Sequence, residues 1–502
     1  MKKGFHWYDS IFIFLLIYLF IFQIQAIWPF TIDDMFISLR YARNWAAGDG
    51  LLWNLQSPPV EGYSNFSFVV LGAFSLILNS DPVLVLKSAG VLGLFFTCYF
   101  IYLISRFWFE RRESLIPCLG ILLYKGQIIW AVSGFETTMY QALLCGAVYF
   151  VLRGLGYNLF PGLRGIPKPT YFLFSGLLLT LAGMTRPEAP VFMVLFIILI
   201  LWDMPQKGSK NYWQGMLLFF LPLLFIFLPY FLWRWSYYGF LFPNSVYCKG
   251  LANTSYVLDK NYLKLIWPFA AFSFFAWFKK PDKRYYFLGL PSLLYLLMLL
   301  GSDPVAAFDN RLFLPAFVLL LPLALKGICD TVIMYSKQRD QIFFTALYIV
   351  SFCVAFFFIP SATLAEYRYF KNNPVQGEQL RTKVLRWLDR HARKHDTVVL
   401  ADAGFIPYHS QLNFIDSYCL NNLSMTQYPK AQMYEQFCHR ILGEKPQVII
   451  LTALIEHGQV TYTPSDICLK KILKGQDEYK LTKVFYTESP DSKYQYELFT
   501  NF

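Results

Sequence analysis

Apolar residues occur along the chain in runs of membrane-spanning length, separated by short polar or basic stretches. A helix needs about twenty apolar residues to cross the hydrocarbon core of a bilayer. An apolar run at 66–79 is too short, and we expect it to dip only into the outer leaflet. The longer runs predict about eleven crossings, near residues 10–29, 84–106, 114–131, 137–153, 170–184, 187–203, 213–232, 263–278, 285–300, 311–334 and 342–361.

The basic residues of the loops predict how the chain is oriented. Basic loops face the cytoplasm in membrane proteins, which places the loops at 153–168, 203–212, 279–284 and 335–340 on that side. Two lysines, Lys2 and Lys3, precede the first apolar run, which is too long for a signal peptide and has no cleavage site after it. We therefore expect a cytoplasmic N-terminus, and an odd number of crossings puts the C-terminus outside.

The composition changes after about residue 362, where the chain becomes charged and mixed. A helix is predicted at 375–394, and strands at 397–400, 448–451, 483–486 and 494–499. The predicted fold class is therefore a polytopic α-helical membrane protein with a soluble α/β domain. We expect residues 1–361 to form the transmembrane domain, including a first outer loop at 30–65, and residues 362–502 the outer α/β domain.

Composition supports this class and excludes others. The chain is 56% hydrophobic over 502 residues, above the usual 45–50% of soluble domains. Its net charge of +12 does not indicate nucleic acid, because much of it lies in short loops; anionic membrane lipids or a lipid phosphate suit it better. No nucleotide-binding motif occurs. One disulfide is possible among Cys419, Cys438 and Cys468 of the tail, but free buried thiols are the favoured interpretation.

Two adjacent carboxylates, Asp33 and Asp34, stand where the chain leaves its first span. The stretch 34–47 reads as an amphipathic helix lying on the membrane, with Arg40, Arg43 and Asn44 facing outward. Two adjacent acids at this position are candidates for a catalytic role. Either acid has an alternative role as the N-cap of that helix, and spacing alone does not distinguish the two roles.

Other outer loops also carry acids and cations at helix ends, and we expect them to share a site at the membrane interface. The alternative roles are an N-cap for Glu136, snorkelling to headgroups for Arg186, and a surface ion pair between Glu188 and Arg186. The remaining candidates fall into two groups. The expected substrate ligands are Glu61, Tyr63, Asn65, Glu188, Asn244 and Asp303, and the further cations are Lys249 and Arg311.

The first loop reads DDMFISLRYARN from Asp33, then GDGLLWN from Gly48 and PVEGYSN from Pro59. With SGFET, TRPE and YGFLFPNSVYCK in later loops, and DAGFIPY in the tail, this ordered set resembles the GT-C superfamily of polyprenyl-phosphate-sugar-dependent glycosyltransferases. The most similar branch contains the mycobacterial terminal arabinofuranosyltransferases. Met35 and Phe135 depart from the pattern of that branch, without affecting the chemistry.

The resemblance implies an inverting transfer from a polyprenyl-phosphate sugar to a cell-envelope glycan or glycolipid, on the outer face of a bacterial inner membrane. Asp33 is expected to be the general base, with Asp34 next. Arg40, Arg43, Arg186, Lys249 and Arg311 are expected to meet the charge of the leaving phosphate. Some family members hold a divalent cation (Mg²⁺, Mn²⁺ or Ca²⁺), for which Asp34 and Glu136 are candidate ligands. The transferred sugar implied by the branch is arabinofuranose. Lipopolysaccharide is one of the acceptors compatible with the resemblance.

The main alternative is a transporter or lipid flippase. Such proteins place ionisable residues near the middle of the membrane and often contain inverted repeats. Here the spans carry almost no charge and show no repeat, whereas the acids gather at one interface. A membrane scaffold without activity, which uses its tail to bind a partner, is a further alternative.

Overall fold

The computed structural model describes residues 7–204, 208–249, 260–279, 281–298, 308–336, 341–394, 396–456, 459–487 and 492–502. The chain divides into two compact units. Unit 1 contains residues 1–28, 87–232 and 255–367, and unit 2 contains residues 29–86, 233–254 and 368–502. The first outer loop, which the sequence assigned to the transmembrane domain, thus groups with the C-terminal tail.

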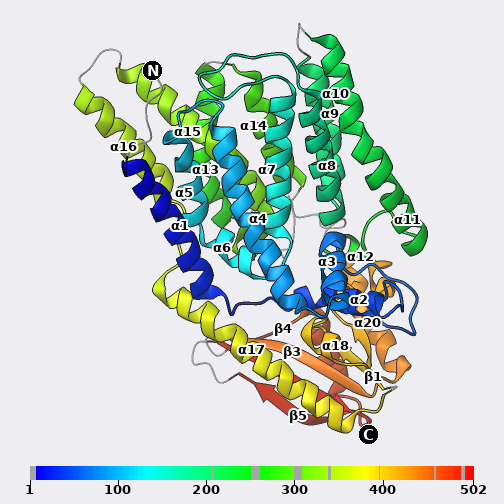
Figure 1. The fold of residues 1–502 in the computed structure, drawn as a ribbon. Helices are drawn as coiled ribbons and strands as arrows, with labels where there is room; N and C mark the ends of the chain where they lie inside the picture. Colours follow the sequence, from blue (N-terminus) through cyan, green and yellow to red (C-terminus); the bar gives the residue numbers. More distant parts are fainter. Residues whose placement is uncertain are drawn as a thin grey trace. The chain divides into compact units, whose positions relative to one another are not determined.

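Unit 1 is a bundle of apolar helices (Figure 1). Helix α15 packs against α13, α14 and α16 and also contacts α5 and α7. Many large apolar side chains of α8, α9 and α10 are exposed, as expected for helices that face lipid. The helices are α1 (Trp7–Ile27), α4 (Pro82–Ser105), α5 (Ile116–Leu123), α6 (Lys125–Val132), α7 (Thr137–Gly154), α8 (Pro169–Thr185), α9 (Ala189–Trp202), α10 (Ser209–Pro222), α13 (Lys260–Lys279), α14 (Lys283–Met298), α15 (Leu314–Ser336) and α16 (Gln341–Phe357).

Each predicted crossing corresponds to a helix or a bent helix pair, but not all of these helices are long enough to span a membrane. Within the described residues, four helices are long and apolar enough, or five if one bent pair is counted as a span. That pair is α5 and α6, which meet at 69° where one straight helix over 114–131 was expected. The region 66–79 is a helix of only 12 residues, α3 (Phe66–Ile77), as its short apolar run predicted.

Helix α10 continues through the π-helical segment Leu223–Phe227 into α11 (Leu228–Tyr238). Pro222 lies just before the π-helical segment. Proline lacks the N–H that would continue the i to i−4 hydrogen bonds, and irregular turns of this kind are a common result. The last residues of α11, from Trp233 onward, belong to unit 2.

In unit 2, helix α2 (Met35–Ala46) packs against α3 and is buried on nearly every side. The close approach uses Gly72, because a Cβ there would lie 2.9 Å from a Leu39 methyl carbon. The prediction that Arg40 and Asn44 face outward is wrong, since their side chains are 3% and 5% exposed. Helical periodicity identified the helix but not the tail segments that cover its polar face.

The tail forms a mixed sheet in the order β2-β1-β3-β6-β5, with β4 paired to β3. Strands β2, β1 and β3 are parallel, and β6 runs antiparallel to β3 and β5. The core strands β1 and β3 bury Val398, Val399, Ile449 and Ile450. The strands are β1 (Thr397–Leu400), β2 (Asn413–Asp416), β3 (Val448–Glu456), β4 (Gln459–Tyr462), β5 (Lys480–Tyr486) and β6 (Ser492–Thr500).

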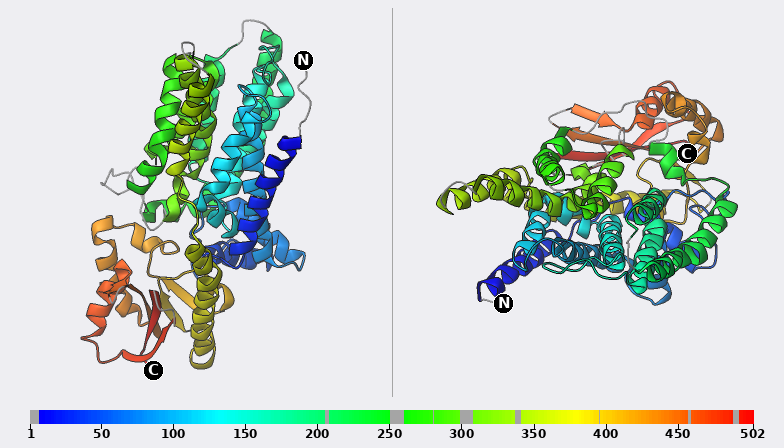
Figure 2. Two further views of the ribbon diagram at one scale, coloured as in Figure 1. Left: turned by 90° about the vertical axis from the view of Figure 1, so that its left-hand side faces the viewer. Right: turned by 90° about the horizontal axis from the view of Figure 1, so that it is seen from above.

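Helix α17 lies along one face of this sheet (Figures 1 and 2). Its buried side chains Leu380, Val384 and Leu388 recur at helical spacing. All four predicted strands and the predicted helix are confirmed. The tail helices are α17 (Leu364–His391), α18 (Phe405–His409), α19 (Leu423–Thr426), α20 (Lys430–Ile441) and α21 (Pro464–Leu473), and α12 (Asn244–Lys249) also belongs to unit 2.

Two disulfides are present in unit 2. Cys248 is bonded to Cys419, and Cys438 to Cys468, with Cα–Cα distances of 5.8 and 6.3 Å. The expectation of free thiols in the tail is therefore wrong. The sequence could not reveal the pairing, because Cys248 lies 171 residues before its partner.

Candidate functional site

The carboxylate of Asp33 is held by the tail of the chain within unit 2. Its Oδ2 accepts a hydrogen bond from the backbone N–H of Gly404 and its Oδ1 one from Phe405, both at 3.0 Å. Nε of Arg381 lies 3.1 Å from Oδ1. These contacts orient the carboxylate but leave room for another donor, because an ionised carboxylate has about four acceptor positions.

Arg381 links Asp33 to a second acid, Asp402, which follows β1. Its Nη2 lies 3.4 Å from Asp402 Oδ2, and Asp402 also accepts hydrogen bonds from the hydroxyls of Tyr494 and Tyr496. Burial raises the pKa of Asp33 to about 6, against the opposing charge of Arg381. Asp33 thus titrates close to neutral pH, where a carboxylate is an effective general base.

Asp34 differs from Asp33. It occupies the N-cap position of α2, yet its side chain makes no capping hydrogen bond. In the part of the chain that the structure describes, no hydrogen bond or ion pair involves its carboxylate. Neither acid therefore caps α2, and the capping alternative is wrong.

Arg40 and Arg43 point from α2 into the tail rather than outward. The Arg40 guanidinium donates to the carbonyl oxygens of Trp53, Pro407 and Leu412. Its carbon also lies 5.2 Å from the ring centres of Trp53 and Phe414. Arg43 donates to the carbonyls of Tyr408 and Ser410. Neither guanidinium is paired with a carboxylate among the described residues.

Three other residues of the first loop, predicted as substrate ligands, make internal contacts. Glu61 is buried and forms an ion pair with Arg234 at 2.5 Å. The Tyr63 hydroxyl lies 3.1 Å from that of Tyr238. Asn65 accepts a hydrogen bond from Ser38 at 2.8 Å. These residues fix the path of the loop.

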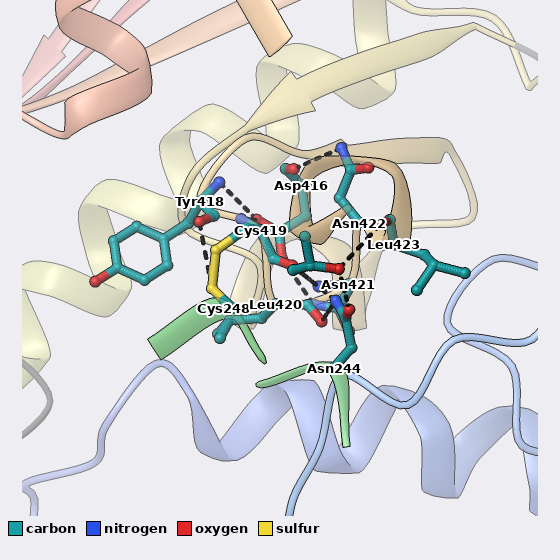
Figure 3. Close-up of a disulfide and its surroundings, with 10 residues drawn as sticks. Asn244, Cys248, Asp416, Tyr418, Cys419, Leu420, Asn421, Asn422 and Leu423 are labelled. Carbon is teal, nitrogen blue, oxygen red and sulfur yellow. Dashed lines mark hydrogen bonds between the residues drawn. A yellow bond between two sulfur atoms is a disulfide. The ribbon is translucent and has the colours of Figure 1, made fainter. Parts of the chain in front are cut away.

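Asn244 ties α12 to a turn of the tail beside the Cys248–Cys419 disulfide (Figure 3). Its amide donates to the carbonyl oxygens of Cys419 and Leu420 at 2.9 and 2.8 Å. The turn itself is closed by Asp416, which accepts the backbone N–H groups of Tyr418, Cys419 and Asn421. Lys249 is the last residue of α12, and Asp303 lies outside the described residues.

In unit 1, Glu136 joins two arginines from different loops. Its Oε1 lies 2.8 Å from Arg186 and 2.9 Å from Arg311, and its side chain is fully buried. Arg186 also pairs with Glu188 at 2.5 Å, and Glu188 accepts a hydrogen bond from Tyr295. The sequence named Glu136, Arg186, Glu188 and Arg311 as candidates, and the structure brings these four together. The side chain of Glu136 makes no capping hydrogen bond to α7.

The predicted metal ligands, Asp34 and Glu136, do not form a cluster with other acidic, His or Cys side chains among the described residues. No group of three His, Cys, Asp or Glu side chains in the described part of the chain lies close enough to hold one. Glu136 faces two guanidinium groups that would repel a cation.

Sequence reasoning missed three charged residues. Arg381 and Arg234 are the partners of Asp33 and Glu61. Lys87 is 4% exposed, donates to the Trp28 carbonyl and lies over the Trp28 ring. A lysine or arginine inside an otherwise apolar helix was the available signal for Lys87 and Arg234, whereas Arg381 looks like one of many charges on α17.

The tail of the chain matches a known protein family. Residues 366–499 match a family described as "Domain of unknown function (DUF8728)". No curated protein sequence matches the chain.

Several solved structures share the fold over nearly the whole chain. ArnT from Cupriavidus metallidurans, bound to undecaprenyl phosphate, has a TM-score of 0.60 at 11% identity, over 98% of each chain. The oligosaccharyltransferase AglB from Archaeoglobus fulgidus, with an inhibitory peptide and a dolichol-phosphate, has a TM-score of 0.58 at 11% identity, over 91% of this chain and 75% of the AglB chain. The arabinofuranosyltransferase AftD from Mycobacteria has a TM-score of 0.50 at 12% identity, over 94% of this chain and 39% of the AftD chain.

These similarities cover residues of both units, and the three matched structures are all GT-C glycosyltransferases. At 10–12% identity they establish the fold and not the substrate. The chain therefore has the GT-C fold, and the resemblance seen in its sequence is confirmed at that level.

Proposed function

We propose that the protein is an inverting glycosyltransferase that moves a sugar from a polyprenyl-phosphate donor to a glycan or glycolipid acceptor. The observation that carries this proposal is the state of Asp33 in a GT-C fold. It is a carboxylate fixed by two backbone N–H groups, with a pKa raised to about 6. Two structures with this fold contain lipid phosphates, undecaprenyl phosphate in ArnT and dolichol-phosphate in AglB.

In this proposal Asp33 accepts the proton of the acceptor hydroxyl as that oxygen attacks the anomeric carbon of the donor. The raised pKa makes the carboxylate basic enough to take the proton while still ionised at neutral pH. Its side chain is 14% exposed, so a substrate hydroxyl can reach it. Asp34, immediately next to it and without a partner in the described chain, is the second candidate for this role.

Departure of the lipid phosphate leaves negative charge, which side-chain cations can stabilise. Arg186 is suited to this role because Nη2 donates no hydrogen bond to the described residues, whereas Nε and Nη1 are held by Glu188 and Glu136. A guanidinium that is fixed by acids on one edge presents its remaining N–H groups in a set direction. Arg311 and Lys249 are further candidates from the predicted set, which also included Arg40 and Arg43.

The two disulfides support an extracytoplasmic position for unit 2. Disulfides persist in oxidising compartments such as the periplasm and are rare in the cytosol. Together with the basic loops of the membrane helices, they favour transfer on the outer face of a bacterial inner membrane. The branch that the first loop resembles suggests arabinofuranose as the transferred sugar. Lipopolysaccharide is one acceptor to be tested.

Transfer of radiolabelled sugar from synthetic polyprenyl-phosphate donors by the purified protein tests the proposal. Arabinofuranose and aminosugar donors should be offered with envelope extracts as acceptors. We expect transfer by the wild type and transfer about 10²–10⁴-fold slower by Asp33→Asn at equal expression. Movement of intact lipid-linked sugar across proteoliposomes, unaffected by Asp33→Asn and without transfer, would instead support the transporter alternative.

A further inference from the structure

Unit 2 contains a cavity of about 410 Å³ between α2, the first loop and the segment that precedes β2. Pockets for small ligands usually have volumes of about 300–1,000 Å³. Arg40 and Asn44, which are buried, and Lys394, Gln56 and Gln411, which are exposed, all line it. Every lining residue belongs to unit 2, so the cavity is formed within one compact body.

The charge of this cavity is not balanced by the protein. Arg40, Arg43 and Lys394 line it, and Asp49 is the only acid among the lining residues. The two guanidinium groups are held by carbonyl oxygens and an amide, not by carboxylates of the described chain. A buried arginine normally has an anionic partner. Burial and the charge of Arg43 lower the pKa of Arg40 to about 9, which an anion in the cavity would reverse.

The contacts available to a ligand come from the edge of the cavity. Arg40 has four of its hydrogen bonds satisfied internally, so it supplies charge more than direct contact. Nη1 and Nη2 of Arg43 each donate one hydrogen bond to a carbonyl oxygen, and the remaining N–H groups of this guanidinium can bind a ligand. The side-chain amides of Gln56 and Gln411 make no hydrogen bond with the described chain. Amides of this kind both donate to and accept from sugar hydroxyls.

We propose that this cavity binds an anionic sugar unit of the acceptor, through Arg43 and Lys394 on its carboxylate or phosphate and through the amides on its hydroxyls. The assignment rests on the proposed glycosyl transfer. It differs from the sequence prediction, which gave Arg40 and Arg43 to the donor phosphate. The lining explains the change, because an isoprenoid tail needs apolar walls and only Ala47, Leu55 and Leu412 are apolar here.

The test is direct binding to the full-length protein in detergent, without donor. Glucuronate, glucose 6-phosphate, glucose and geranyl phosphate are titrated separately and followed by saturation-transfer NMR. We expect one or both anionic sugars to bind, glucose to bind much more weakly, and added salt to weaken binding. Glucuronate alone would identify a uronic acid, and glucose 6-phosphate alone a phosphorylated sugar.

Variants connect the binding to this cavity. We expect Lys394→Gln and Arg43→Gln each to weaken the anionic sugar about tenfold, the loss of one charge-assisted hydrogen bond. Lys383→Gln, an exposed lysine of α17 that does not line the cavity, is the matched control. Lys394 is exposed, so its variant tests the site even if Arg43→Gln fails to fold.

Three outcomes would overturn the proposal: no binding of either anionic sugar, binding that Lys394→Gln and Lys383→Gln weaken equally, or binding of geranyl phosphate in place of the sugars. The transfer reaction is tested separately, since Asp33→Asn should slow transfer about 10²–10⁴-fold and keep sugar binding. Transfer without binding overturns the cavity assignment alone, and binding without transfer overturns the proposed function.

Discussion

Asp33 Oδ2 lies 3.0 Å from the backbone nitrogen of Gly404, a residue 371 positions later in the chain. The start of the first outer loop is thus fastened to the turn between β1 and α18. The tail therefore orients the residue proposed as general base. Gly404 and Phe405, which donate these hydrogen bonds, belong to the DAGFIPY motif of the tail.

Gly404→Ala should disturb this contact. A Cβ at Gly404 would lie 2.0 Å from the carbonyl oxygen of Asp33 and 2.5 Å from its Oδ2. Overpacking of this kind costs about 1–3 kcal/mol of stability, and we also expect lower kcat because Asp33 is displaced. Thermal unfolding and transfer assays measure both effects. Gly443→Ala, where no atom lies within 4 Å of the added carbon, is the control. Equal stability and equal kcat in the two variants would show that the contact between Gly404 and Asp33 does not position the carboxylate.

The pH dependence of transfer should reveal the base. Asp33 must be ionised to accept a proton, and its pKa is raised to about 6. We therefore expect kcat/KM to fall below about pH 6 and to be constant above it, until another group titrates. Asp33→Asn should lower kcat about 10²–10⁴-fold and abolish the acidic limb.

Asp34→Asn is the informative comparison for that profile. If Asp33 is the base, the limb near pH 6 persists in this variant. A limb that is retained in Asp33→Asn and lost in Asp34→Asn would assign the proton to Asp34 instead. Arg381→Gln provides a third profile, since loss of a nearby positive charge should raise the pKa of Asp33 further.

The sequence predicted much of this arrangement, for reasons that differ by residue. Apolar runs located the helices because membrane crossing depends mainly on local composition, and buried β-branched runs located strands such as 397–400. Glu136 and Arg311 were found as charges at helix ends. The partners Arg381 and Gly404 were not, because contacts between distant segments depend on how the tail folds back onto the first loop.

Two short strands also escaped prediction for physical reasons. β2 has only four residues, and its pairing with β1 comes from the parallel register of Val399 with Ile415. β4 is almost entirely exposed, so it lacks the alternating pattern that identifies a strand with one buried face. The outward orientation expected for Arg40 failed because an amphipathic pattern does not distinguish solvent from a polar protein surface.

Arg186→Gln should lower the rate of transfer by about 10²-fold if its free edge stabilises the leaving phosphate. A loss confined to kcat would indicate an interaction that forms as the bond to phosphate breaks. Arg111→Gln, an exposed arginine of the same unit, should have no effect. Unchanged kcat in Arg186→Gln with normal expression would leave Arg311 and Lys249 as the candidates.

The stability of the protein should fall with rising pH because of Asp466. This carboxylate is fully buried in α21, accepts one backbone N–H from Thr452, and has its pKa raised by burial from 3.8 to about 7. The folded state therefore holds a proton that the unfolded state loses between about pH 4 and pH 7. Within that window the free energy of unfolding decreases by up to about 1.4 kcal/mol per pH unit from this group, and above it the contribution is constant.

Asp466→Asn should flatten that dependence, because the amide does not titrate and its oxygen can still accept the Thr452 N–H. Melting temperatures of the full-length protein between pH 4.5 and 8 measure the effect. Asp477→Asn, an exposed acid of the same domain, is the control. Parallel curves for wild type and Asp466→Asn would show that the buried carboxyl is not the titrating group.

The Cys248–Cys419 disulfide joins α12 to the turn that Asp416 closes (Figure 3). We expect mass spectrometry of the protein isolated without reductant to detect a Cys248–Cys419 peptide pair and a Cys438–Cys468 pair, because both form in an oxidising compartment. Cys248→Ser should lower stability by about 2–4 kcal/mol and should free Cys419 for alkylation. Cys353→Ser, at an exposed free cysteine, should do neither. Detection of Cys248 and Cys419 as free thiols in freshly isolated protein would contradict both the pairing and the extracytoplasmic position proposed for unit 2.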